Sequence, residues 1–175
     1  VDERRRARHE ELERYVQRLE RPEGREELRA LADRITVGET YFFRHTAQLS
    51  AFVEEVLPAL APAAASRGGP RLLSARCSIG EEPYTLGLLQ REHLPRLAPG
   101  CRGEVLAVDL SPAALARARR ARYSSWSLRQ VDPQRRAREW RRAGNEWCLE
   151  SAARELVTFE ERNLIEPDPA FWLPG

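Results

Sequence analysis

The segment Ser74–Glu82 joins a short apolar run to a helical pattern through a turn of small residues, and it ends in two adjacent carboxylates. In doubly wound α/β folds a ligand binds at the carboxyl ends of the strands, where small residues such as Ala75 and Gly80 let the backbone approach it. The helix that follows contributes unpaired N–H groups and a partial positive charge. Glu81 and Glu82 would repel a pyrophosphate but suit a ligand with an ammonium or sulfonium cation. The alternative is that both acids only complement the helix dipole.

A second candidate ligand is Asp109, which lies in the apolar run Glu104–Leu110, 29 residues after Gly80. A carboxylate at the end of the second strand of a strand–helix–strand unit can accept two hydrogen bonds from a ribose diol. The alternative is that Asp109 caps the helix beginning at Pro112, but Ser111 already fills that role. We therefore favour ribose binding.

A third segment, Thr36–Arg44, lies between two helical patterns and carries a hydroxyl and a guanidinium group. Thr40 and Arg44 are four residues apart, so in a helix they would share one face and meet a carboxylate together. Phe42 and Phe43 are most simply core residues. Taken alone, this segment indicates chemistry only weakly.

The elements that would position these residues fall into two groups. Three amphipathic helical patterns come first, and the third has the clearest apolar stripe, with Thr46 as its N-cap. They span Leu12–Leu19, Leu28–Ile35 and Thr46–Leu60. The stretch Ala61–Pro70 then loses periodicity and gains glycine and proline. The sequence therefore predicts a helical N-terminal domain over residues 1–60 and a linker over 61–70.

Strand and helix patterns alternate after the linker, which predicts parallel strands joined by right-handed crossovers. The expected strands are Arg71–Ala75, Glu104–Leu110 and Leu156–Glu160, and the expected helices are Glu81–His93 and Ala113–Arg122. The predicted fold class is α/β, with a Rossmann-like sheet over 71–175. Three strands are few for a doubly wound sheet, and the chain stops in a turn-like sequence, so we expect this domain to be incomplete.

Together the three segments resemble the signatures of the CheR-type family, the S-adenosylmethionine-dependent glutamate O-methyltransferases of bacterial chemoreceptors. The family's first signature, T-x-N-x-T-x-F-F-R, reads TVGETYFFR at Thr36–Arg44. Its second, CSxGEEPYS, reads CSIGEEPYT at Cys77–Thr85, and this is the most specific match. Its third, A-T-D-I with a following A-R-x-G-x-Y, reads AVDL and ARRARY within Ala107–Tyr123. The family's N-L pair matches Asn163–Leu164.

The chain departs from the family pattern at three places. Gly38 stands where the first signature has asparagine, and Ala121 replaces a usual glycine. The family's next strand, with C-R-N-V and a tyrosine near the methyl group, would begin just after Gly175. We therefore expect this chain to bind cofactor poorly and to be inactive on its own.

The resemblance implies methyl transfer from S-adenosylmethionine to glutamate carboxylates on the cytoplasmic helices of chemoreceptors, with S-adenosylhomocysteine as the product. It implies no catalytic base and no metal, and a positioning role for Arg44. Glu81 would bind the ammonium group, although Glu82 remains an alternative, and Asp109 would bind the ribose. The other implied cofactor contacts are Thr40 with Arg44 at the methionine carboxylate, Ala75 and Gly80 at the turn, and Asn163 with Leu164 at the adenine.

Composition limits the remaining possibilities. At 175 residues, 42% hydrophobic and 32% charged, the chain reads as a soluble globular protein. No stretch approaches the roughly 20 apolar residues of a membrane span, so no membrane insertion is expected. The three cysteines form no close pair, which fits a reducing, cytoplasmic setting and no zinc site.

The charge is concentrated in one segment. All 29 basic residues are arginine, and Arg117–Arg142 holds ten of them against two acids. This run is either a solvated surface or a docking site for an acidic partner. Nucleic-acid binding is disfavoured because no aromatic residues are interleaved in a stacking motif. A runner-up function is a degenerate, non-catalytic cofactor-binding or partner-docking module of a chemosensory pathway, which Gly38 and the absent strand would favour.

Overall fold

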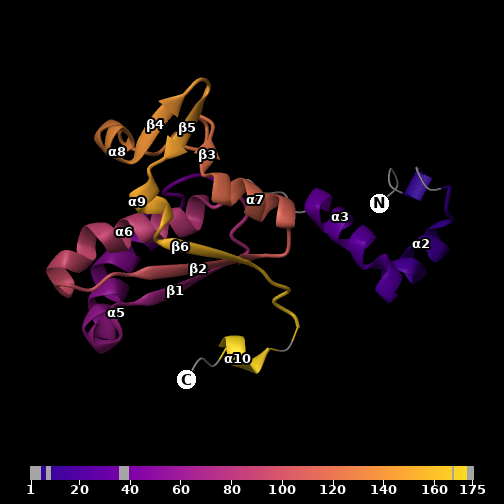
Figure 1. Cartoon of the computed structure of the whole chain (residues 1–175), viewed down its shortest axis with the longest axis horizontal. Helices are drawn as coiled ribbons and strands as arrows, with labels where there is room; N and C mark the ends of the chain where they lie inside the picture. Colours follow the sequence, from indigo (N-terminus) through magenta and orange to yellow (C-terminus); the bar gives the residue numbers. More distant parts are fainter. Residues whose placement is uncertain (1–4, 7–8, 36–39, 167, 173–175) are drawn as a thin grey trace. The chain divides into compact units, whose positions relative to one another are not determined.

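The computed structural model describes residues 5–6, 9–35, 40–166 and 168–172 (Figure 1). The chain divides into two compact units, Val1–Gly38 and Glu39–Gly175. The sequence analysis had placed the boundary at residues 61–70, and this is wrong because the third predicted helix packs within the second unit.

The first unit is a pair of helices, as predicted. α2 (Leu12–Leu19) and α3 (Arg25–Ile35) are joined by a 3₁₀ turn at Pro22–Gly24. Tyr15 is fully buried, and its hydroxyl donates a hydrogen bond to Glu27 across the pair at 2.9 Å. Gly24 is required at the turn, because a Cβ atom there would lie 2.0 Å from the carbonyl oxygen of Arg18.

The second unit opens with one continuous helical run. It consists of α4 (Thr46–Ala51), a π-helical segment (Phe52–Val56), α5 (Leu57–Ala64) and a 3₁₀ turn (Ala65–Arg67). Pro58 has no N–H to donate to the preceding turn, which the wider π-helical segment accommodates. Thr46 is the first helical residue and His45 occupies the cap position, so the predicted N-cap is one residue too late. The predicted linker is also wrong, since Ala61–Arg67 is helical.

This helical run packs against the helix Glu81–Leu97, and it is rich in apolar residues. Leu57 and Ala61 are buried in one cluster with Leu94 and Ala98. By length and composition alone, Thr46–Arg67 passes the test for a membrane-spanning helix, with a mean hydropathy of 1.2. Only 17% of its apolar window is buried, so it is not a typical core helix, but one such helix is weak evidence for a span.

A parallel sheet in the order β1-β2-β6 forms the centre of the second unit. Its strands are β1 (Arg71–Ala75), β2 (Glu104–Asp109) and β6 (Val157–Glu161), and its crossover helices are α6 (Glu81–Leu97) and α7 (Pro112–Arg120). The register pairs Ala75 with Val108 and Asp109 with Glu161, so the carboxyl ends meet at one edge. Figure 1 shows the three strands side by side with both crossover helices above them. The predicted α/β class and parallel sheet are confirmed.

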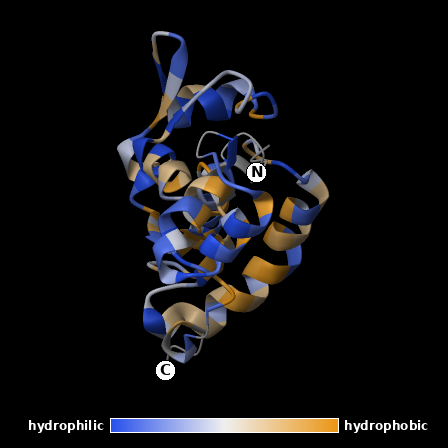
Figure 2. Cartoon of the chain, turned by 90° about the vertical axis from the view of Figure 1, so that its right-hand side faces the viewer, coloured by the Kyte–Doolittle hydropathy of each residue, from blue (hydrophilic) through white to orange (hydrophobic). Residues whose placement is uncertain are grey.

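A small antiparallel sheet between α7 and β6 was missed by the sequence analysis. Its order is β3-β5-β4, and its strands are β3 (Arg122–Tyr123), β4 (Trp140–Ala143) and β5 (Glu146–Leu149). The helices α8 (Pro133–Glu139) and α9 (Ser151–Arg154) flank it, and α10 (Pro169–Trp172) follows β6. The β4–β5 hairpin, at the top of both views, is mostly hydrophilic at its tip (Figure 2).

Buried contacts join the small sheet to the rest of its unit. The Phe42 ring lies edge-on to Tyr123 and Trp140, at 4.7 and 4.8 Å between ring centres. The Glu139 carboxylate is buried and pairs with Arg91 of α6 and with Arg138. Burial opposes ionisation of Glu139, but the two arginines outweigh it and lower its pKa. A cavity of about 440 Å³ beside this network is lined by Leu88, Arg91, Glu92, Arg135, Arg138, Glu139, Glu150 and Ala152.

Candidate functional site

The turn after β1 has an unusual backbone. Arg76 and Ser78 adopt left-handed conformations with φ of 59° and 51°, and Gly80 has φ of 98°. A non-glycine residue in this region carries strain that tends to persist at functional sites. A Cβ atom at Gly80 would lie 3.0 Å from Ala118 and from the Tyr123 hydroxyl, so glycine is favoured there on two counts. The turn therefore has a strained backbone at Arg76 and Ser78, at the edge where the carboxyl ends of the strands meet.

Asp109 holds this turn against the end of β2. Its carboxylate accepts hydrogen bonds from the backbone N–H groups of Ser78 at 2.8 Å and Ser111 at 2.9 Å. The Ser111 hydroxyl accepts from the N–H of Ala114 at 3.0 Å, so the predicted N-cap is confirmed. Each carboxylate oxygen of Asp109 keeps a second lone pair, which leaves capacity for a ligand hydroxyl. Asp109 therefore has a structural role that its proposed ribose contact would share.

Glu81 and Glu82 lie in different environments. Glu81 is 0% exposed, and neither carboxylate oxygen has a hydrogen-bond partner at the usual distance and angle among the described residues. Burial raises its pKa, while its own backbone N–H, the Ser127 hydroxyl and the positive charges of Arg117 and Arg129 act in the opposite direction. Glu82 is exposed and accepts a hydrogen bond from the Ser74 hydroxyl at 2.7 Å. A buried carboxylate without a donor is costly, and a cationic ligand would relieve that cost.

The segment Thr40–His45 is a turn, so the prediction that Thr40 and Arg44 share a helical face is wrong. Phe43 and His45 both have φ of 58°, and the helix begins only at Thr46. Arg44 is exposed, with its guanidinium carbon 5.9 Å from the centre of the Tyr41 ring. Two residues of the first signature, Thr36 and Gly38, lie outside the described residues.

Hydrogen bonds bring the three sequence signatures together. The N–H of Phe43 donates to the Thr85 hydroxyl at 3.2 Å, and that hydroxyl donates to the Glu81 carbonyl at 2.7 Å. The Tyr123 hydroxyl donates to the carbonyl of Ile79 at 2.9 Å. The bonds of Phe43 with Thr85 and of Tyr123 with Ile79 connect residues 42 and 44 positions apart. Phe43 and Tyr123 are also buried in the same core cluster.

Asn163 and Leu164 follow β6 at the same edge. The N–H of Arg162 donates to the Asp109 carbonyl at 3.0 Å, which holds this segment against β2. The Asn163 amide donates to Glu166 at 3.2 Å and accepts from the N–H of Ile165 at 3.3 Å. The Asn163 amide keeps a second N–H and a second oxygen lone pair, so a ligand contact could be added to these local hydrogen bonds.

Comparisons with known proteins decide which family this arrangement represents. The family model described as CheR methyltransferase, SAM binding domain, matches residues 38–172. The chain belongs to the CheR family. It is 35% identical over 142 residues to chemotaxis protein methyltransferase 2 of Vibrio cholerae, which covers 79% of this chain and 48% of the relative.

Two other relatives are also methyltransferases by name. Chemotaxis protein methyltransferase 1 of Pseudomonas aeruginosa is 33% identical, over 78% of this chain and 51% of the relative. The probable biofilm formation methyltransferase WspC of Pseudomonas putida is 31% identical, over 90% of this chain and 36% of the relative. The chain thus spans about half the length, or less, of these curated relatives.

The structure also adds a segment that the sequence analysis left out of the site. The loop after β3 carries Ser127, whose carbonyl accepts from the N–H of Phe42 at 3.0 Å. On the same loop, Arg129 stacks on the Tyr41 ring. In the sequence, a tryptophan and an arginine three residues apart after Tyr123 were the only visible signal, and nothing in that spacing pointed to the first signature.

Proposed function

We propose that this chain is the cofactor-binding part of an S-adenosylmethionine-dependent methyltransferase that forms glutamyl methyl esters on chemoreceptor cytoplasmic helices. The observation that carries the proposal is the buried carboxylate of Glu81, which has no hydrogen-bond partner at the usual distance and angle within the described structure and whose burial outweighs the groups that favour its charge. It lies at the first turn of α6, beside the strand ends where ligands of α/β sheets bind. An S-adenosylmethionine molecule offers an ammonium group suited to such a carboxylate.

The other ligand contacts follow from position at this edge. Asp109 would accept hydrogen bonds from the ribose through its remaining lone pairs, and Arg44 would pair with the methionine carboxylate. Ala75 and Gly80 leave room for backbone approach. The remaining contacts assigned by the family signatures are Thr40 at the carboxylate end and Asn163 with Leu164 at the adenine.

The chemistry requires positioning more than proton transfer. The cofactor supplies a methyl group on a sulfonium, which is a good leaving group. A glutamate acceptor is ionised at pH 7, so no side chain of this chain has to remove a proton. Glu81, Asp109 and Arg44 would fix the donor so that the acceptor oxygen approaches opposite the carbon–sulfur bond. Such alignment is worth up to about 7–11 kcal/mol in favourable cases.

Calorimetric titration with S-adenosylhomocysteine tests the proposal. A version extended at the C-terminus to the length of the relatives, called the full-length protein below, should bind it. This chain alone should bind more weakly, because it spans about half the length of those relatives. Binding by neither would refute cofactor recognition. Binding by the full-length protein without methyl transfer to receptor helices would favour the non-catalytic module instead. We propose a cytoplasmic location, because the acceptor helices of the receptors are cytoplasmic.

A further inference from the structure

The arginine-rich run Arg117–Arg142 is used largely within the fold. Three of its members have carboxylate partners: Arg122 with Glu146, Arg135 with Glu92 and Asp132, and Arg138 with Glu139. Three others contact backbone carbonyls or an aromatic ring: Arg119 with Phe159, Arg142 with Gly144, and Arg136 with Trp147. The run is therefore not a uniform positive surface, and its members have to be considered one at a time.

Arg129 differs from its neighbours because its guanidinium group lies close to two aromatic rings. The central carbon lies 3.5 Å from the centre of the Tyr41 ring and 4.1 Å from that of Trp126. One N–H donates to the Trp126 carbonyl at 2.8 Å. Among the described residues no carboxylate is within ion-pair distance of Arg129. Its guanidinium group is thus held in place, and several of its N–H donors remain for a ligand.

The loop that carries Arg129 is anchored at its base and open at its tip. Leu128 and Val131 are buried in the core, and the Trp147 indole donates to the Ser125 hydroxyl at 3.2 Å. Trp126 is 64% exposed, which is unusual for so large an apolar side chain. A rigid aromatic side chain beside an arginine is typical of residues that dominate protein–protein binding.

Arg129 and Tyr41 also lie next to the proposed cofactor site. Tyr41 follows Thr40 in the first signature, and the N–H of the adjacent Phe42 is bonded to Ser127 of the Arg129 loop. The Arg129 charge acts on the Glu81 carboxylate as well. A protein that brings a side chain to the methyl group would therefore pass close to Trp126 and Arg129.

We propose that Arg129, held against Tyr41 and Trp126, binds a second carboxylate of the acidic protein segment that carries the methyl-accepting glutamate. The planar fork of a guanidinium group matches a carboxylate and would engage both of its oxygens. The acceptor must keep an oxygen lone pair free, so the fork suits a neighbouring acid rather than the acceptor itself. The proposal rests on the proposed methyl transfer and makes Arg129 a residue that selects the substrate.

The test is peptide binding to the full-length protein in the presence of S-adenosylhomocysteine, measured by fluorescence anisotropy. The probe is a labelled alanine-based helical peptide of about 20 residues, with one glutamate as acceptor and a second one turn later. The matched peptide has glutamine at the second position. Arg129→Ala should weaken binding of the first peptide at least tenfold and leave binding of the second unchanged. Arg129→Lys should fall between, because it keeps the charge without the stacked plane.

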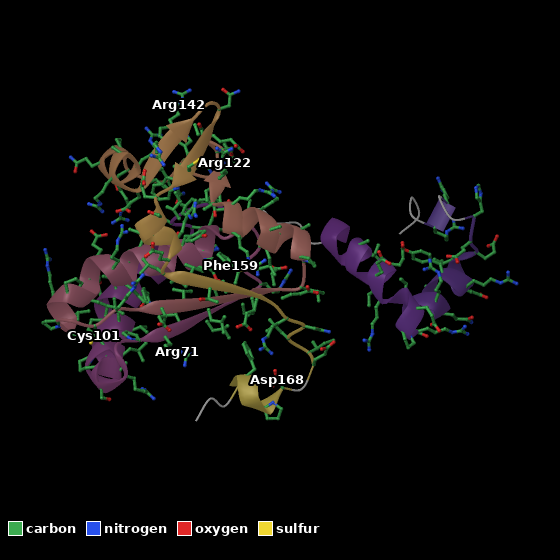
Figure 3. All side chains as sticks on the ribbon, viewed as in Figure 1. Arg71, Cys101, Arg122, Arg142, Phe159 and Asp168 are labelled. Carbon is green, nitrogen blue, oxygen red and sulfur yellow. The ribbon has the colours of Figure 1, made fainter. Side chains whose placement is uncertain are left out.

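Arg71→Ala serves as the matched control for loss of one positive charge. Arg71 begins β1, at the opposite end of the strand from the site, and its side chain is 68% exposed. In Figure 3 it lies away from the small sheet, which the labels Arg122 and Arg142 locate. This variant should bind both peptides as the parent does. Equal binding by parent and Arg129→Ala, equal losses with both peptides, or no peptide binding by the parent would each overturn the proposal. Cofactor titration is independent of these results, so failure of the proposed function would be seen separately.

Discussion

Replacing Glu81 by glutamine should make the empty protein more stable and its ligand binding weaker. The carboxylate is fully buried without a well-aligned donor among the described residues, and burial outweighs the groups that favour its charge, so ionisation opposes folding. Removing this only partly compensated buried charge should stabilise the protein by about 1–3 kcal/mol. For a chain of this size, that corresponds to a rise of about 2–12 °C in Tm. Loss of a charge-assisted bond to the ligand ammonium should weaken binding about 10- to 150-fold.

The pH dependence gives this prediction a sign. Burial raises the pKa of Glu81, so folding favours the protonated form. Its stabilising contribution is present at acidic pH and is lost as the pH rises through the folded-state pKa. Parent and Glu81→Gln should therefore have similar Tm values near pH 4.5 and should diverge toward neutral pH, with the variant higher.

The assay is thermal unfolding across this pH range, with S-adenosylhomocysteine titration at neutral pH. Glu82→Gln is the matched control, because Glu82 is exposed and bonded to Ser74. It should leave both Tm and ligand affinity nearly unchanged. If Glu81→Gln lowers Tm, or binds ligand as tightly as the parent, then Glu81 is a structural residue and not a ligand-binding residue.

Three further substitutions test other parts of the site and fold. Asp109→Ala should lower stability by about 2–3 kcal/mol, because two N–H groups lose their acceptor, and should weaken S-adenosylhomocysteine binding. Asp109→Asn should have smaller effects, and unchanged ligand affinity by calorimetry in both variants would remove Asp109 from the site. Glu139→Gln should lower stability by about 1–3 kcal/mol at pH 7. Because Arg91 and Arg138 lower the pKa of Glu139, urea titrations should show that difference shrinking below pH 4.5 and would contradict us if it persisted. Methyl transfer by the full-length protein should fall from parent to Arg44→Lys to Arg44→Ala at constant Tm; equal activities would show that Arg44 is only a surface residue.

Elements with strong local signals were predictable from the sequence. β1 matches its predicted range, α2 follows the apolar spacing of its sequence, and α6 begins at Glu81 after the Gly80 turn, as predicted. The small antiparallel sheet was missed because its strands are two to four residues long and rich in arginine, so no alternation was visible. The domain boundary was misplaced because composition in Ala61–Pro70 suggested a linker, whereas alanine and buried packing on α6 keep most of it helical.

The site was predictable where a motif fixed both residue type and position. The signatures indicated that Glu81 and Asp109 would lie at neighbouring strand ends. Hydrogen bonds from Ser78 to Asp109 and from Tyr123 to Ile79 connect the second and third signatures. Sequence alone left Glu81 and Glu82 equivalent, because burial depends on tertiary packing. It also allowed Thr40 and Arg44 to share a helical face, which the left-handed Phe43, bonded to Thr85, excludes.

Thr85 connects two segments that are distant in the sequence. Its hydroxyl accepts a hydrogen bond from the N–H of Phe43 and donates one to the carbonyl of Glu81, so it couples the first turn of α6 to the loop before α4. Serine, which the family signature has at this place, keeps both bonds, whereas valine, with nearly the same shape, keeps neither. The backbone of two remote segments, and not the ligand, therefore restricts position 85 to hydroxyl side chains.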